Sequence, residues 1–132
     1  MAQPAAKQGD RIVAIDTHIV MVSTPGGLVP TPLPHPFVGV ISGGLSSDVK
    51  IAGKPAATVD STADAAPAHI PTPPGTAFQN PPANKATIRV GSPTVKVNGK
   101  PAARNGDTAA TCNDPTDLPV GTVIAVGTVL IG

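Results

Sequence analysis

Glu, Trp and Tyr are missing from this sequence, and its only aromatic side chains are those of Phe37 and Phe78. Leu and Met are also scarce, so few good helix formers are present and we expect almost no helix. The net charge is only +1, and the sequence has neither a basic stripe nor an aromatic platform. These absences argue against a nucleic-acid partner.

Long hydrophobic runs are missing too. The longest, residues 123–131, is far shorter than a membrane-spanning segment, and residues 1–22 carry four charged side chains, unlike a signal peptide. The single cysteine, Cys112, excludes an intramolecular disulfide and is typical of a protein that folds in a reducing compartment. We therefore expect synthesis in the cytoplasm without a cleaved leader.

The residues that are abundant favour strands and loops. Val, Ile and Thr are frequent, and their β-branched side chains suit a pleated sheet. The 17 Pro and 14 Gly indicate long loops, while apolar residues make up 40% of the chain and cluster in short alternating runs, unlike a disordered segment. The 132 residues predict a single all-β domain over 1–132, with long Pro/Gly-rich loops at 19–45 and 64–86.

A repeat organises the chain. Residues 49–63 and 95–109 are identical at nine of fifteen positions. A third copy is split between the ends, because residues 4–10 match 101–107 and the C-terminal segment 120–132 resembles the approach to the third repeat at 90–98. The chain thus begins and ends at the same point of the repeat. This pattern predicts a closed, pseudo-threefold assembly of β-hairpins in which the terminal strands pair; the alternative is an old duplication inside an ordinary β-sandwich.

Each copy has the local signals of a hairpin. Asn98-Gly99 is a strong type I′ turn signal, and a Pro such as Pro101 suits an edge or corner because it lacks an N–H. The two Ala residues that follow indicate close approach of backbones near an axis. Asp10 and Asp107, which follow Gly in two copies, are expected to cap turns rather than to form a catalytic pair.

Three His and one Cys fall at related places in the repeat. His18 and His69 each lie fourteen residues after the motif Pro, and Cys112 lies eleven after it. Around a threefold axis these side chains would converge, and His35, in the predicted loop 23–37, would supply a fourth ligand. Three imidazoles and one thiolate form a closed structural zinc site, which would stabilise a chain with so few aromatic residues. The alternative is that these histidines lie in loops without a ligand.

Other features allow two interpretations each. The Pro-rich stretches 25–36 and 67–82 are either polyproline recognition motifs or rigid loops beside the ligands, and rigid loops are favoured. Four lysines at matching positions of two copies form either a solvated face or a charged rim that meets a partner. They are Lys50, Lys54, Lys96 and Lys100.

An enzyme is not expected. A zinc hydrolase would need an open coordination position and a general base, and without Glu the base would have to be an Asp. The candidates would be Asp16, Asp64, Asp114 and Asp117. Four protein ligands would close the site, so this alternative is disfavoured.

The sequence PAAR at 101–104, its variants PAAK at 4–7 and PAAT at 55–58, and the one Cys after the last copy resemble the proline–alanine–alanine–arginine (PAAR) repeat family. The resemblance implies a compact cone with a triangular base, like a β-helical prism. Such cones cap the trimeric valine–glycine repeat (VgrG-type) or phage-like spike of type VI secretion and related contractile injection systems. They help to pierce a target membrane, and many hold one structural zinc ion through three His and one Cys. Carried over to this chain, the ligands would be His18, His35, His69 and Cys112, with iron as the alternative metal.

The resemblance also sets expectations about partners. It implies a monomer that binds a spike trimer by its base, meets the target membrane transiently, and is delivered out of the bacterial cytoplasm at the tip of the apparatus. No effector domain is expected on the chain, so any cargo would bind non-covalently; an adaptor that mainly loads a separate toxin is the alternative function. The middle copy departs from the pattern with Thr58 for Arg and with Val59-Asp60 where Gly-Asp would come, so one face of the base is expected to differ.

Overall fold

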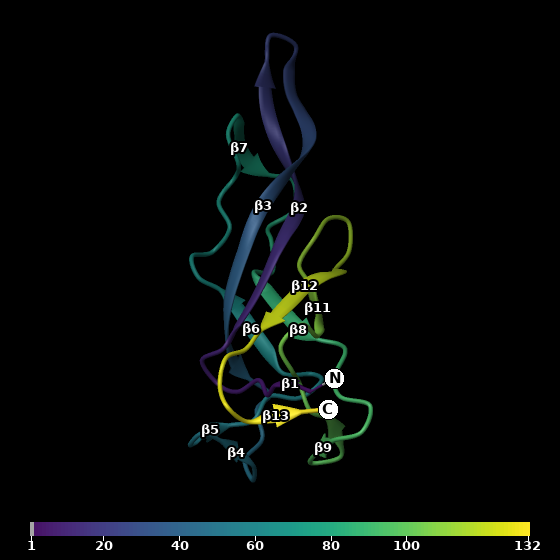
Figure 1. The fold of residues 1–132 in the computed structure, drawn as a ribbon. Helices are drawn as coiled ribbons and strands as arrows, with labels where there is room; N and C mark the ends of the chain where they lie inside the picture. Colours follow the sequence, from purple (N-terminus) through teal and green to yellow (C-terminus); the bar gives the residue numbers. More distant parts are fainter. Residues whose placement is uncertain (1) are drawn as a thin grey trace.

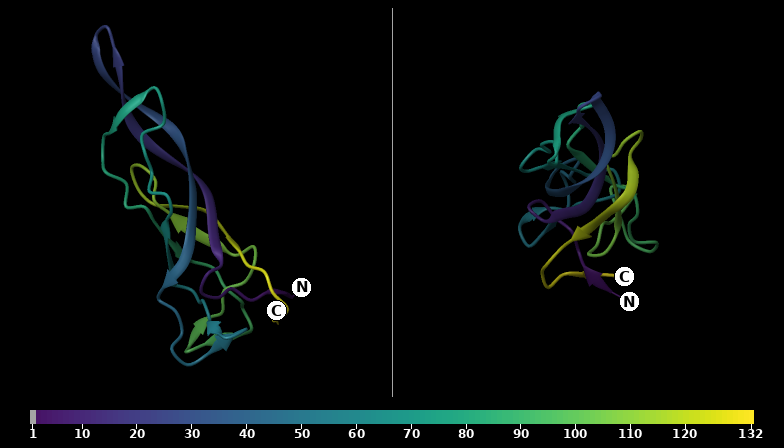
Figure 2. Two further views of the ribbon diagram at one scale, coloured as in Figure 1. Left: turned by 90° about the vertical axis from the view of Figure 1, so that its left-hand side faces the viewer. Right: turned by 90° about the horizontal axis from the view of Figure 1, so that it is seen from above.

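The computed structural model of the chain describes residues 2–132, and these contain strands, turns and loops but no helix, as the sequence predicts. The molecule tapers from a broad base, where both termini lie, to a narrow apex formed by one long hairpin (Figures 1 and 2). The strands are β1 (Gln3–Pro4), β2 (Arg11–Thr24), β3 (Gly27–Gly43), β4 (Lys50–Ile51), β5 (Lys54–Pro55), β6 (Thr62–Ala65), β7 (Gly75–Phe78), β8 (Lys85–Ile88), β9 (Lys96–Val97), β10 (Lys100–Pro101), β11 (Thr108–Thr111), β12 (Leu118–Ile124) and β13 (Leu130–Ile131).

Three short hairpins form the base. Two are continuous, β4–β5 and β9–β10, and the third is made by the two ends of the chain, β13 and β1. Pro4 pairs with Leu130 just as Pro101 pairs with Lys96 and Pro55 with Lys50. The two ends of the chain therefore form a hairpin that corresponds to the two continuous ones.

The three copies close into a ring at the second Ala of each motif, and we call Ala6, Ala57 and Ala103 the alanine ring. The N–H of Ala6 donates to the carbonyl of Ala103 (2.9 Å), that of Ala103 to Ala57 (3.0 Å), and that of Ala57 to Ala6 (3.0 Å). Each motif thus bonds to the next around an axis. This closure confirms the pseudo-threefold arrangement and excludes the duplicated sandwich.

Alternation of the strand places the two Ala residues of each motif in different clusters. The alanine ring belongs to the main core, whereas the first Ala of each motif lies in a basal cluster. This basal cluster consists of Ala5, Ala56 and Ala102 with the apolar hairpin residues Ile51, Val97 and Ile131. The small side chain is required because three copies meet at one axis.

Turn caps follow the motif, and the middle copy differs as expected. Asp10 accepts the backbone N–H of Lys7 at 3.0 Å, and Asp107 accepts that of Arg104 at 2.7 Å; both pairs also form ion pairs between their side chains. In the middle copy the cap is Ser61, which accepts the N–H three residues earlier at 2.9 Å. One face of the base therefore lacks the partly buried ion pair of the other two.

Above the base, six strands close into a second ring. They pair in the order β2, β3, β6, β8, β11, β12, and β12 pairs again with β2, while β7 is added to the upper part of β2. The inward side chains form the main core with the alanine ring. Its other members are Ile12, Phe37, Ile41, Ala63, Ala86, Ile88, Ala109, Cys112, Val123 and Ala125.

The apex corrects one prediction. Residues 19–45 were expected to be a long loop, but β2 and β3 pair without interruption from Thr24↔Gly27 to Arg11↔Val40. The loop was predicted because residues 25–36 are rich in proline. A strand is nevertheless possible, because proline lacks only the N–H and is tolerated where that N–H would point away from the partner strand. The stretch 67–82 does contain loops, although β7 forms within it.

Candidate metal centre

The structure brings three of the four predicted ligands together and adds an unexpected carboxylate. His18 lies on β2, Cys112 follows β11, and His69 lies in the segment between β6 and β7. One ligand-type atom from each of them, and one from Asp16, lie within 4.8 Å of one another. The cluster is buried, with exposed fractions of 0% for Asp16, 1% for His18 and 3% for Cys112.

His35, the fourth predicted ligand, lies beside this cluster on β3. Its ring centroid is 5.3 Å from that of His18 and 5.7 Å from that of His69. In the structure its nitrogens bind the chain: Nδ1 donates to the Leu33 carbonyl at 2.9 Å, and Nε2 accepts the N–H of Thr72 at 3.1 Å. The imidazole therefore holds the loop that carries Thr72 against β3.

The register of the apical strands explains why these residues meet. Asp16 on β2 is paired with His35 on β3, so alternation points both side chains to the interior. His18, two residues further along β2, points the same way. Phe78 on β7 packs against the rings of His18 and His35, at centroid distances of 5.8 and 5.4 Å. Apolar and aromatic side chains thus exclude water from the cluster.

Asp16 links the cluster to two neighbouring polar side chains. Its Oδ1 accepts hydrogen bonds from the Thr111 hydroxyl and, at 3.4 Å, from the Asn113 amide. Its Oδ2 lies 2.9 Å from Nε2 of His69 and 3.5 Å from Sγ of Cys112. From the sequence Asp16 was expected only as a candidate base of a hydrolase, so its place in this cluster was not predicted. The signal was present, because Asp16 lies in step with Ile12, His18 and Val20, the inward positions of β2.

Burial sets the protonation behaviour of the ligands. Desolvation, followed by the neighbouring His69, lowers the pKa of His18, and desolvation also lowers the pKa of His35. Both rings are therefore neutral near pH 7 and each has one nitrogen lone pair, which in His35 accepts the N–H of Thr72. Desolvation raises the pKa of the Cys112 thiol to about 11, so a metal ion must displace its proton to bind sulfur.

The donor set fits a structural zinc ion. His18 directs Nε2 toward Cys112, while its buried Nδ1 lies 3.6 Å from Oδ2 of Asp114 and has no hydrogen-bond partner among residues 2–132. Sγ of Cys112 lies 3.6 Å from Nε2 of His18, and two ligands of a tetrahedral zinc ion lie about 3.3–3.7 Å apart. Imidazole nitrogen, thiolate sulfur and carboxylate oxygen are the donors that zinc takes in proteins, so the buried group of Asp16, His18, His69 and Cys112 is compatible with a zinc ion.

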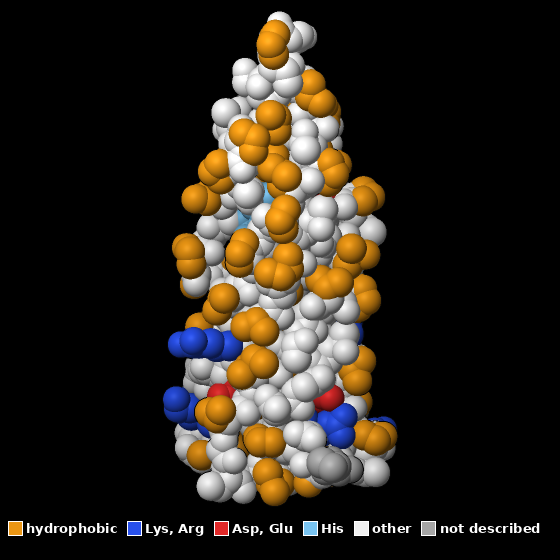
Figure 3. Space-filling view, turned by 45° about the horizontal axis from the view of Figure 1, so that its top comes forward, with side chains coloured by type: hydrophobic (Ala, Val, Ile, Leu, Met, Phe, Trp, Pro, Cys, Tyr) orange, Lys and Arg blue, Asp and Glu red, His pale blue; other side chains and the backbone are white. Residues whose placement is uncertain are grey.

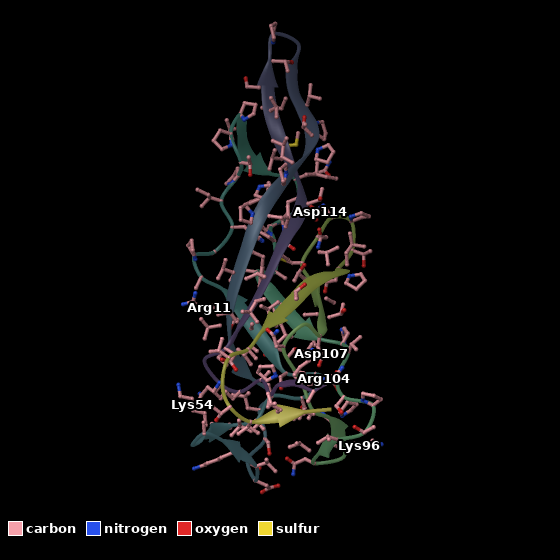
Figure 4. The ribbon with its side chains drawn as sticks, in the orientation of Figure 1. Arg11, Lys54, Lys96, Arg104, Asp107 and Asp114 are labelled. Atoms are coloured by element: carbon pink, nitrogen blue, oxygen red, sulfur yellow. The ribbon has the colours of Figure 1, made fainter. Side chains whose placement is uncertain are left out.

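The four predicted lysines lie far from this centre, on the basal hairpins. Lys50 and Lys54 belong to β4 and β5, and Lys96 and Lys100 belong to β9 and β10; all four are exposed. Figure 4 shows Lys54 and Lys96 at the broad end of the molecule, well below Asp114 near the metal centre.

These features define a small β-protein with a pseudo-threefold base and a buried cluster of metal-binding side chains. The chain belongs to the PAAR-motif family, whose model matches residues 24–115. This family supplies the tips of contractile spikes, which are structural parts. A comparison with curated proteins finds no match. Among residues 2–132 no helix is long and apolar enough to cross a membrane.

Proposed function

We propose that the protein is a zinc-stabilised tip that caps and sharpens the trimeric spike of a type VI secretion or related contractile injection system. The observation that supports this most directly is the closed ring of three hairpins at the base. A single chain with three pseudo-equivalent faces matches the symmetry of a trimer, which a chain without internal repeats would not do. It would be assembled in the cytoplasm and delivered outward with the spike.

In this proposal zinc joins segments that are far apart in the sequence. His18, His35, His69 and Cys112 come from β2, β3, the segment before β7 and the segment after β11. His35 would exchange its hydrogen bond from Thr72 for the metal, as its ring position beside the other two imidazoles allows. The bound ion would cross-link these four segments. Iron would fit the same role, and elemental analysis distinguishes the two metals.

The distribution of charge supports opposite roles for the two ends. No Asp, Glu, Lys or Arg occurs between residues 17 and 47, which form most of the apical hairpin. On the face shown in Figure 3, Lys and Arg side chains gather near the base and none lies at the apex. An uncharged apex suits entry into a membrane, while the basal lysines are placed to meet the spike.

Binding to a spike trimer tests the proposal. Mixing the purified chain with a trimeric spike protein of the same organism should give a complex of one chain per trimer, measured by light scattering after size exclusion. The double variant Lys50→Glu/Lys96→Glu should weaken binding by up to about 30-fold at low salt, because two exposed ion pairs contribute up to about 1 kcal/mol each. Lys85→Glu, on β8 above the base, is the matched control. Absence of any complex with the trimer would contradict the proposal.

Asp16 is expected to position His69 and to balance charge in the metal centre. Zn²⁺ with one thiolate carries a net charge of +1, and Asp16 is the fully buried carboxylate beside it. Asp16→Asn is expected to weaken zinc affinity by about 10–100-fold, the usual effect of losing such an outer partner, in competition with a chromophoric chelator. Asp64→Asn, an exposed site on β6, should leave the affinity unchanged. Equal affinities of the two variants would contradict this role.

A further inference from the structure

The outer edge of β3 is the exposed sheet edge of the apex. Along one side β3 pairs with β2 from Gly27 to Val40, and along the other it pairs with β6 only from Gly39 onward. Within residues 2–132, no strand pairs with the outer side of β3 between Gly27 and Val38. Such an edge normally presents free N–H and C=O groups to which a further strand can add.

Proline occupies every second position of this edge. The residues are Pro30, Pro32, Pro34 and Pro36, and they are paired with Met21, Ile19, Thr17 and Ile15 of β2. In an antiparallel pair, alternate residues direct both backbone groups outward. A proline has no N–H to give to β2, so these four pairs must be the non-hydrogen-bonded ones. The same alternation continues along β3 to Val38, whose carbonyl points outward and accepts the N–H of Ala66 at 2.9 Å.

The prolines therefore remove donors from the outward side and leave those facing β2 intact. An added strand needs both a donor and an acceptor from each outward residue of the edge. At the four prolines only the carbonyl remains, that of Pro34 already accepts the Thr72 hydroxyl at 2.7 Å, and the ring projects where the N–H would be. The pairing of β2 with β3 loses nothing, which explains how a Pro-rich segment forms a strand of 17 residues.

The opposite edge of the hairpin is protected in another way. On β2, strand β7 pairs with Val20–Val22. Below it the N–H of Thr17 donates to the Asn113 side chain at 2.6 Å, and that of Ile19 donates to Asp114 at 2.9 Å. The edge of β2 is thus covered by the chain. The edge of β3 is met at Pro34 and His35 by the segment that carries Thr72, and nearer the tip, at Pro30 and Pro32, it lacks donors.

We propose that the four prolines, a proline edge, close β3 against strand addition by a second copy of this chain. The hazard is real at this place, because the apex has no charge to repel a copy and Leu28 and Val29 are 58% and 45% exposed. Two copies would otherwise pair along their β3 edges and blunt the tip. This device is independent of the metal and of the spike.

The test restores the missing donors. Pro30→Thr/Pro32→Thr lies on the part of the edge farthest from the base, and Thr keeps a β-favouring, exposed side chain. Sedimentation velocity from about 10 to 500 µM should show the wild type as a monomer throughout and the variant as a concentration-dependent dimer. Amide exchange in the dimer should slow at residues 30 and 32, where the new N–H groups bond across the interface.

Two control variants distinguish the effect of restoring edge N–H groups from the effect of losing a proline and from that of changing an exposed side chain. Pro25→Thr removes a proline at the hairpin turn, and Val29→Thr changes an exposed side chain whose N–H already faces β2; both should remain monomeric. A folded double variant that stays monomeric up to 500 µM would overturn the proposal. If the double variant does not fold, Pro30→Thr alone decides in the same assay, with a folded monomer again overturning it.

Discussion

Replacing Cys112 with Ser is expected to remove the bound zinc and to lower the melting temperature by about 10–20 °C. A ligand present at about a thousand times its dissociation constant stabilises the folded state by about 4 kcal/mol, and each kcal/mol moves the melting temperature of a domain of this size by about 3–5 °C. Removal of the thiolate leaves only harder donors for zinc. Plasma mass spectrometry on protein purified without chelator gives the metal content, and calorimetry gives the melting temperature.

A chelator separates loss of zinc from loss of packing. Cys112 is a buried member of the main core, but Ser has nearly the same volume, so wild type and Cys112→Ser should melt at similar temperatures once the metal is removed. His69→Ala should behave like Cys112→Ser in the presence of zinc. Wild-type protein that contains no stoichiometric metal, or that melts at the same temperature with and without chelator, would contradict the metal centre.

Cobalt substitution distinguishes the roles assigned to His35 and Asp16. In the proposed set His35 is a ligand, so His35→Ala should change the visible spectrum of the cobalt form. Asp16 acts from outside the set, so Asp16→Asn should keep the band positions while it weakens the affinity. The opposite pattern would identify Asp16 as the fourth ligand, in agreement with the distances of the metal-free cluster, and would leave His35 with its bonds to Leu33 and Thr72.

The base could be predicted from the sequence because its information is local and repeated. The match of residues 4–10 with 101–107 placed Pro4 in register with Pro101, and the structure pairs Pro4 with Leu130 as that register requires. The Asn98-Gly99 turn also forms as expected, with both residues at positive φ. In a repeat protein the same hairpin is encoded three times, so a wrong prediction for one copy can be corrected by comparison with the other two.

The apex could not be predicted in the same way. From composition alone, the segment with Pro30 and Pro32 is predicted to be a loop. It can form a strand only if its prolines direct the missing N–H away from the partner strand. That side is fixed only by pairing with β2, which requires the position of the turn at Pro25. Asp16 was missed as a member of the metal centre for a related reason. Alternation along β2 is enough to place Asp16 on the inward face, but its position beside His69 and Cys112 depends on how distant segments pack and does not follow from spacing in the chain.

The second large effect is expected at the alanine ring, where Ala57→Leu should destabilise the fold by at least about 3 kcal/mol. Overpacking a core usually costs about 1–3 kcal/mol when neighbours can shift. Here Ala57 is only 1% exposed, and its backbone is hydrogen-bonded to Ala6 and Ala103. A larger side chain at this position would press on the other two motifs, whose backbones are held in place by the same ring of hydrogen bonds. Urea unfolding followed by circular dichroism gives the free energy of unfolding.

The matched control is Ala77→Leu, which makes the same change at an exposed position of β7 and is expected to alter stability by less than about 0.5 kcal/mol. If the closed ring organises the base, Ala57→Leu should also loosen a distant contact, the pairing of Pro4 with Leu130, and so speed amide exchange at Leu130. An effect confined to the β4–β5 hairpin would show instead that the three copies fold independently. The variant therefore measures the free-energy cost of overpacking the ring. It also tests whether the ring makes the terminal hairpin and the β4–β5 hairpin unfold together as one cooperative unit.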